Sequence, residues 1–283
     1  MWEANQEDFK KINDWGLTNN PFKAGEDFSE RKKEFRWLNP EHREAYAKYI
    51  QKRLEYIGQK DFDDYYKVAV KPIDRTRWEY LMNRKSWYIM PLGWKNFAIN
   101  GGIIADCGCG DGDTIQRIIN FVEKYWKENN IDGKKIHIVG FDLNQSRIDN
   151  AKKLVSCSNQ NITFEFQQRD IVTNGFEQKD GFFNYSVITG VLEIIDDKSF
   201  KKFLDEVCRV TNKGLYVEDL FEKFPGGFPR DNLIEELQKR KFEVKKKHII
   251  LSEPFDIDKL QDPMKLWPII LVQNIWAEKN SKY

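Results

Sequence analysis

From residue 100 onwards the chain alternates short apolar runs with amphipathic segments, and this alternation restricts the fold more than any other feature. In the segment 114–128, for example, apolar residues recur near the i, i+3, i+4, i+7 spacing of one helical face. The expected strands are 103–107, 136–141, 162–166, 182–188 and 215–217; the expected helices are 114–128, 146–155, 200–210 and 232–240, the last capped by Asp231. Such alternation predicts a mostly parallel sheet with helices on both faces.

The two ends of the chain depart from this pattern. Two further strands, 242–251 and 269–276, are separated by a polar loop without a clear helix, which predicts an antiparallel pair at one edge of the sheet. Residues 1–99 show no convincing strand and are rich in aromatic side chains, so we expect a helical extension there. The predicted fold is α/β: a seven-stranded, mostly parallel sheet with an antiparallel edge strand over residues 100–283, preceded by this extension.

A glycine-rich segment, Asp106–Gly112 (DCGCGDG), stands where the first strand passes into the first helix; we call it the glycine loop. Glycines at alternate positions let the backbone turn sharply and approach a ligand closely, and the N-terminus of the next helix offers free N–H groups. Asp113 stands where a dinucleotide-binding fingerprint has its third glycine. Asp106 would repel a pyrophosphate but attract an ammonium group. Both acids argue against a nicotinamide oxidoreductase.

Acidic residues also follow the next two strands. Asp142 ends the second strand, where its carboxylate can accept hydrogen bonds from both hydroxyls of a ribose. Asp170 follows the third strand and can accept from the exocyclic amine of an adenine, with Ile171 against the ring. Ligands of open α/β sheets bind at the carboxyl ends of the strands. Three acids there predict a site for an adenosine linked to a cationic amino acid.

These segments resemble the class I S-adenosylmethionine-dependent methyltransferases, whose fold is Rossmann-like. The resemblance covers residues 100 to about 280. It rests on DCGCGDG, GFDLN at 140–144, RDI at 169–171, ITGVLEII at 188–195 and FLDEVCRVTNKGLYVEDL at 203–220. It implies S-adenosylmethionine as the cofactor and S-adenosylhomocysteine as the product.

The resemblance also implies a role for individual positions around the cofactor. The methionine end would contact Asp106, Gly108 and Gly110; the ribose and adenine would contact Asp142, Leu143, Asp170 and Ile171; the sulfonium region would lie above Thr189 and Gly190. One position departs from the pattern, since many relatives carry His where Ile194 follows Glu193. The chain also lacks the Asn/Asp-Pro-Pro-Tyr tetrapeptide, which argues against the branches that methylate bases and glutamine amides.

Methyl transfer from a sulfonium is an in-line displacement that depends mainly on alignment of the reacting atoms. A general base is needed only for an acceptor that starts protonated. The first candidate for that base is Glu193, and the alternatives are Asp196, Glu218 and Asp219.

The aromatic extension is expected to fold over the carboxyl ends of the strands as a lid. Aromatic rings there would suit an amine, a sulfur compound or a ring as the acceptor. The rings expected to line that pocket are Tyr65, Tyr66, Trp87, Tyr88 and Trp94. Arg230, in a Gly-Gly loop after the fifth strand, is expected to pair with an acidic acceptor.

Composition narrows the class of partner. The 46 basic and 45 acidic residues give a net charge of +1, without the basic excess that phosphate-binding surfaces show. We expect no nucleic-acid partner, no membrane-spanning helix and no metal site, because no His, Cys and carboxylate cluster has ligand spacing. Four cysteines and an N-terminus without a signal-peptide pattern suit the cytoplasm.

The leading hypothesis is a small-molecule O-, N- or S-methyltransferase; the alternatives are a methyltransferase for RNA or protein and a cofactor-binding module without turnover.

Overall fold

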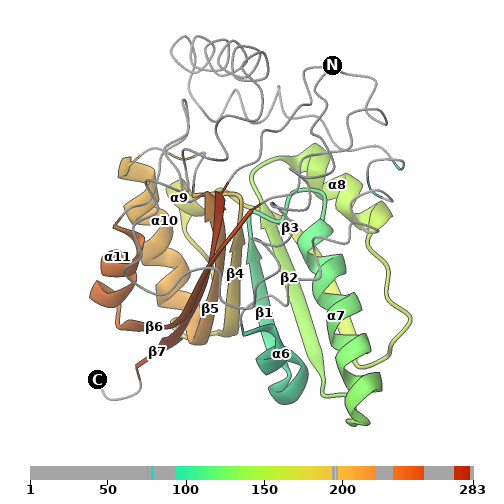
Figure 1. Ribbon diagram of the computed structural model, residues 1–283. Coiled ribbons are helices and arrows are strands. Elements are labelled where there is room, and N and C mark those ends of the chain that lie inside the picture. The colour runs from blue at the N-terminus through green and yellow to red at the C-terminus, as the bar shows by residue number, and fades with distance from the viewer. Residues whose placement is uncertain are drawn as a thin grey trace, which may run out of the picture.

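The computed structural model describes residues 75, 78, 93–192, 195, 197–220, 232–251 and 271–280. In this part of the chain, seven strands form one mixed sheet with helices on both faces (Figure 1). The strands are β1 (Gly102–Cys107), β2 (Ile136–Asp142), β3 (Ile162–Gln168), β4 (Phe183–Thr189), β5 (Thr211–Leu220), β6 (Phe242–Leu251) and β7 (Leu271–Lys279). The helices are α6 (Trp94–Asn100), α7 (Asp113–Asn129), α8 (Gln145–Leu154), α9 (Ile171–Asn174), α10 (Asp197–Val210) and α11 (Leu233–Lys239). The predicted α/β class with a mostly parallel sheet is confirmed.

The strand order is β3-β2-β1-β4-β5-β7-β6. The strands β1 to β5 are mutually parallel, whereas β7 runs antiparallel to both β5 and β6. The first strand, β1, lies in the middle of the sheet, and β2 and β3 follow on one side of it. The chain then crosses to the other side of β1 and forms β4. The order therefore reverses between β1 and β4, the point at which sheets of this kind bind ligands. We call the edge formed by the C-terminal ends of β1 to β5 the carboxyl edge; it is the upper end of the sheet in Figure 1.

Two hydrophobic clusters hold the helices to the sheet. One lies between the sheet and α6, α7 and α8, and contains Ile115, Ile118 and Val122 from the apolar face of α7. The other lies between the opposite face of the sheet and α9, α10 and α11, where Phe203 and Val207 of α10 are buried. The helices occupy opposite sides of the sheet in Figure 1. This double cover explains why the central strands are apolar on both faces.

Three local expectations need correction. The strand expected at 215–217 is β5 and begins at Thr211, because the Thr211 hydroxyl is buried against Val207 O and the Ser186 hydroxyl rather than exposed in a turn. The short helix α9 was not predicted at all. The helix expected to have Asp231 as its cap begins at Leu233, with Asn232 at the N-cap position and no side-chain capping bond.

Most of the N-terminal extension lies outside the described residues, and the expected lid lies there too. The helix α6 is described, and it packs beside α7: the Trp126 indole N–H donates to Ala98 O at 2.7 Å. Trp94 was expected to line an acceptor pocket, but it is 1% exposed and packs in the core against Phe121 and Tyr216. No helix among the described residues is both long enough and apolar enough to cross a membrane.

Candidate cofactor site

The glycine loop makes a tight turn against the end of β2. The N–H groups of Gly108 and Cys109 both donate to Phe141 O, at 2.8 Å each. Gly108 has φ +93°, in the left-handed region, and a Cβ there would lie 2.2 Å from Cγ2 of Val191. Any side chain at this position would be strained and would clash. Position 108 therefore requires glycine, because Val191 lies directly against its backbone.

Asp106 is the least satisfied polar group of this edge. It is the last but one residue of β1 and 1% exposed, and neither carboxylate oxygen has a hydrogen-bond partner among the described residues. Burial raises the pKa of Asp106 well above its usual value; the nearby Asp113 and Asp142 carboxylates raise it further, and Arg117 opposes them. A buried carboxylate without a donor is costly. The position thus suits a ligand that brings a cationic donor.

Asp142 is the last residue of β2 and 2% exposed. Its Oδ2 accepts from the N–H of Gly110 and its Oδ1 from the N–H of Asn144, both at 2.8 Å. Burial raises the pKa of Asp142, while the Arg147 guanidinium and these two N–H groups lower it. Each carboxylate oxygen has more than one lone-pair site. The side chain therefore fixes the glycine loop and keeps acceptor capacity for hydroxyl donors.

Asp170 and Ile171 follow β3, as the sequence indicated, but both have structural partners there. Asp170 Oδ1 accepts from Thr173 N at 2.8 Å and caps α9. Ile171 is 5% exposed and lies in the hydrophobic cluster with Phe176. Leu143 is half-buried beside Asp142. Contact of these residues with an adenine stays a prediction.

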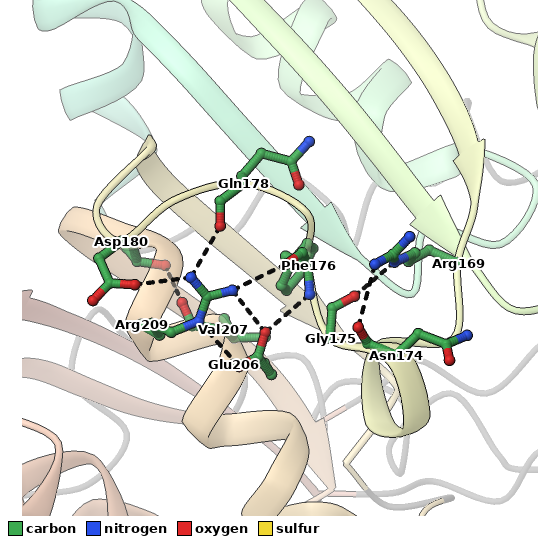
Figure 2. Close-up of polar contacts among 10 residues, drawn as sticks. Arg169, Asn174, Gly175, Phe176, Gln178, Asp180, Glu206, Val207 and Arg209 are labelled. Atoms are coloured by element: carbon green, nitrogen blue, oxygen red, sulfur yellow. Dashed lines mark hydrogen bonds and ion pairs between the residues drawn. The ribbon is translucent and has the colours of Figure 1, made fainter.

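The segment from Arg169 to β4 is tied to α10 by side chains that hold backbone groups (Figure 2). Arg169 donates to the carbonyl oxygen of Gly175 at 2.6 Å. From α10, Glu206 accepts the N–H of Phe176 at 2.9 Å, and Arg209 donates to Phe176 O at 3.1 Å. The ion pair between Glu206 and Arg209 is 2.8 Å long. These contacts fix the backbone that carries Asp170 at the carboxyl edge.

Two further positions lie on the β4 side of the edge. Thr189 is the last residue of β4, and its Oγ1 is buried with no hydrogen-bond partner among the described residues. Gly190 follows it with φ +62° and donates its N–H to Glu218 O at 3.0 Å. A free hydroxyl and an exposed glycine backbone thus stand next to the end of β1, with which β4 pairs.

Glu218, an alternative candidate for the base, is engaged in a buried network. Its Oε2 accepts from the Tyr216 hydroxyl at 2.7 Å and lies 3.6 Å from a guanidinium nitrogen of Arg117. The Tyr216 hydroxyl also contacts Asn274 of β7, and Arg117 lies over the Trp94 ring at 5.4 Å. Glu218 therefore serves here as an anchor between α7 and β5.

Sequence reasoning missed one contact that shapes the loop. Asp111, which is 1% exposed, accepts from Arg147 Nε and from Asn150 Nδ2 of α8, both at 2.8 Å. Thirty-six residues separate Asp111 from Arg147, so no local pattern connects them. The i, i+3 spacing of Arg147 and Asn150 was the available signal, since it places both on one helical face.

Several expected site residues lie outside the described part of the chain. They are Glu193 and Asp196 among the candidate bases, Tyr65, Tyr66, Trp87 and Tyr88 of the expected acceptor pocket, and Arg230. Asp219 is described; it lies near the end of β5 and is 2% exposed. Among the described residues, no three His, Cys, Asp or Glu side chains are grouped so as to hold a metal ion.

Comparison with known proteins places this arrangement in a family. The family model described as a methyltransferase domain matches residues 100–262, which is more than half of the chain. No curated protein sequence gives a significant match.

Solved structures are similar at low identity. A methyltransferase from Methanosarcina mazei, described as S-adenosylmethionine-dependent, is 19% identical with a TM-score of 0.45, over 65% of this chain and 95% of that one. Magnesium protoporphyrin IX methyltransferase from Synechocystis, with bound S-adenosylhomocysteine, is 10% identical (TM-score 0.49; 77% and 97%). A putative RNA methyltransferase from Pyrococcus horikoshii is 13% identical (TM-score 0.48; 73% and 99%).

The match to the family model covers the glycine loop and the acids that follow β1, β2 and β3, and it agrees with the resemblance found in the sequence. The chain therefore belongs to the methyltransferase domain family and is a class I methyltransferase that uses S-adenosylmethionine.

Proposed function

We propose that this chain transfers the methyl group of S-adenosylmethionine to an oxygen, nitrogen or sulfur atom of a small molecule, with the cofactor bound across the carboxyl edge. The observation that carries the proposal is Asp106. A buried carboxylate with no hydrogen-bond donor among the described residues suits the ammonium group at the methionine end of the cofactor. Asp142 is the acceptor for the ribose hydroxyls, and Leu143, Asp170 and Ile171 lie on the side assigned to the adenine.

The charges around the glycine loop support a cationic ligand. Four carboxylates lie within or beside the loop: Asp106, Asp111, Asp113 and Asp142. Among the described residues, Arg117 and Arg147 are the cations that act on them. S-adenosylmethionine carries an ammonium and a sulfonium against one carboxylate, so its net positive charge complements this excess of acid. A dinucleotide, with its negative pyrophosphate, would be repelled.

Bound S-adenosylmethionine supplies an electrophilic methyl group on a good leaving group. The protein's own task is to hold the reacting carbon in line with the acceptor and to exclude water. The bare backbone at Gly190 and the Thr189 hydroxyl stand on the β4 side of the site, where we place the sulfonium. Glu193, beyond β4, is the residue we propose as general base for an acceptor that starts protonated.

The small-molecule acceptor class is inferred from charge. A net charge of +1 offers no general attraction to a phosphate backbone. The aromatic side chains at positions 65, 66, 87 and 88 are proposed to line the acceptor pocket, and Arg230 is proposed to meet an acidic group on the acceptor.

Calorimetric titration with S-adenosylhomocysteine tests the cofactor site. Wild-type protein is expected to bind, and Asp142→Ala is expected to lose about 1–3 kcal/mol of binding free energy because ribose hydroxyls lose their acceptor. Asp149→Ala, an exposed acid on α8, is the matched control and should bind like wild type. Equal affinity in Asp142→Ala and wild type would contradict the ribose assignment.

Acceptor class needs a separate experiment. Purified protein and methyl-labelled cofactor are incubated with a panel of amines, thiols, phenols and carboxylic acids, and in parallel with total RNA and with protein extract. Label transferred to a small molecule supports the proposal. Label found only in RNA or protein would replace it with a macromolecular acceptor, and tight cofactor binding with no transfer to any of the three would indicate a binding module.

A further inference from the structure

The shape of the glycine loop is held from two sides. Towards β2, the loop is fixed by backbone hydrogen bonds from Gly108 and Cys109 to Phe141 O. Gly110 and Gly112 also have positive φ angles, so the second half of the loop has the conformational freedom of glycine. Side chains of α8 supply the restraint on that half.

The second half of the glycine loop is attached to α8 through the Asp111 side chain. Its Oδ2 accepts from Arg147 Nε and its Oδ1 from Asn150 Nδ2, both at 2.8 Å, and the Asp111 side chain is 1% exposed. The Arg147 side chain is 19% exposed. A buried charge-assisted contact of this kind is stronger and geometrically stricter than a surface ion pair. The second half of the loop is thus fastened to α8 and cannot shift independently of it.

Arg147 also covers the neighbouring glycine. A Cβ on Gly110 would lie 2.3 Å from Arg147 Nη2, so the guanidinium rests directly on the Gly110 backbone. The N–H of that same residue donates to Asp142 Oδ2 at 2.8 Å. Arg147 therefore lies against the peptide that connects the loop with the carboxylate proposed to bind the ribose.

We propose that Arg147 is a positioning residue of the cofactor site: together with Asn150 it holds the glycine loop in the shape that presents Gly110 to Asp142 and leaves the Asp142 carboxylate ready for ribose hydroxyls. This inference rests on the proposed cofactor placement. Arg147 acts through Asp111, Gly110 and Asp142, and needs no contact of its own with the cofactor.

A charge effect follows from the same geometry. The Arg147 guanidinium and the N–H groups of Asn144 and Gly110 lower the pKa of Asp142, whereas the Asp111 carboxylate raises it. The Asp142 carboxylate in turn raises the pKa of the Asp106 carboxyl and of the Cys109 thiol. Arg147 is the first group that lowers the pKa of Asp142 against the effect of burial. Its removal leaves the pKa of Asp142 higher. Because an ionised carboxylate accepts hydrogen bonds from hydroxyls more strongly than a protonated one does, cofactor affinity should begin to fall at a higher pH than in wild type as the solution is acidified.

The experiment is titration of S-adenosylhomocysteine into wild type, Arg147→Met, Arg147→Lys and Asp111→Asn between pH 5 and pH 9. Arg147→Met should bind about tenfold more weakly at neutral pH, the loss typical of a buried charge-assisted hydrogen bond. The fall of its affinity at low pH, which we call the acid limb, should move to higher pH. Arg147→Lys keeps the positive charge but loses the planar guanidinium with its several N–H donors. It should therefore return the acid limb to its wild-type position but restore only part of the affinity. Asp111→Asn should weaken binding without moving the acid limb upwards.

A matched control separates positioning from stability. Arg240 joins α11 to α10 through Glu236 and Asp205 and is 14% exposed, so Arg240→Met removes a comparable ion pair away from the glycine loop. It should lower the unfolding temperature and leave cofactor affinity unchanged.

Two results overturn the inference. One is wild-type affinity in Arg147→Met at every pH; the other is a loss that Arg240→Met reproduces in proportion to its loss of stability. If Arg147→Met fails to fold, Arg147→Lys and Asp111→Asn decide by their affinities at neutral pH: the inference predicts weaker binding in both, and wild-type affinity in both overturns it. Failure of wild type to bind S-adenosylhomocysteine would instead refute the cofactor placement itself.

Discussion

At the scale of single residues, the carboxyl edge contains polar groups that receive no hydrogen bond from the part of the chain that the structure describes. Asp106 and the Thr189 hydroxyl are buried without hydrogen-bond partners among the described residues. Buried polar groups are normally paired, so unpaired ones in a native protein require an explanation. A ligand that donates to Asp106 provides one. On the proposed cofactor placement, Asp106 lowers the stability of the free protein and raises its affinity for the cofactor, a trade-off common at functional sites.

Asp106→Asn should separate these two effects. The pKa of Asp106 is raised in the folded state above its ordinary value of 3.8, so wild type loses stability as the pH rises from about 3.8 through the folded pKa. The neutral amide avoids this loss. At pH 7 we expect a gain on the order of 1–3 kcal/mol in the free energy of unfolding, shrinking towards zero below pH 3.8, together with weaker binding of S-adenosylhomocysteine.

Thermal denaturation at pH 3.5 and pH 7, with and without S-adenosylhomocysteine, measures both quantities. The exposed control Asp149→Asn should change neither. A variant that is destabilised at pH 7 yet binds as tightly as wild type would show that Asp106 has a purely structural role.

At the scale of elements, the connection from β3 to β4 is the clearest case of a loop held by a neighbouring helix. The N–H and carbonyl of Phe176 are bound by Glu206 and Arg209 of α10, and Arg209 also reaches Gln178 O at 2.9 Å (Figure 2). Backbone groups of a loop need partners as much as those of a strand. In this connection charged side chains of α10 supply them and so tie the connection between α9 and β4 to that helix.

Glu206→Gln should lower the free energy of unfolding by about 1 kcal/mol at pH 7. This is less than a buried charge-assisted hydrogen bond contributes, because Glu206 and Arg209 are partly exposed. The hydrogen bond from Arg209 lowers the pKa of Glu206 from its ordinary value of 4.5. The stabilisation is therefore present above pH 4.5 and is lost as the pH falls through the lowered folded pKa. Urea unfolding at pH 7 and pH 3 measures the difference. Glu128→Gln, which breaks an ion pair with both side chains about 60% exposed, should have almost no effect; an equal effect of both variants would contradict this account.

At the scale of the whole molecule, the sheet depends on a strand that comes last in the chain. The strand β7 lies between β5 and β6 and pairs with both, although the match to the family model ends at residue 262. Trp276 of β7 is 3% exposed and lies so close to Gly93 and Gly214 that a Cβ on either would overlap its ring. It also packs against Phe97 of α6. The C-terminal strand thus closes the core around the first described helix.

Trp276→Ala should cost about 3–5 kcal/mol of unfolding free energy, as large aromatic truncations in a core do. Chemical denaturation at pH 7 gives the value directly. Phe182→Ala, at a ring 38% exposed, is the control and should cost much less. Equal small losses in both variants would mean that β7 is not part of the cooperative core.

The sequence by itself determined which segments become strands and helices and which of their faces are buried. Periods of two and 3.6 residues are local properties, so the strand–helix alternation predicted the class of sheet and located the glycine loop and Asp142 at strand ends. Where local chemistry was ambiguous the prediction was wrong: β5 begins at Thr211, which is buried although the next two residues are polar and exposed, and α9 is too short to show a period.

Only the tertiary structure decided which distant groups meet. Asp111 contacts Arg147, 36 residues away in the sequence, and Phe176 contacts Glu206, 30 residues away. The strand β7 lies between β5 and β6. These pairings depend on strand order, register and the packing of helices across the sheet, which no local period encodes, because the free energy that selects them comes from burial shared by the whole molecule.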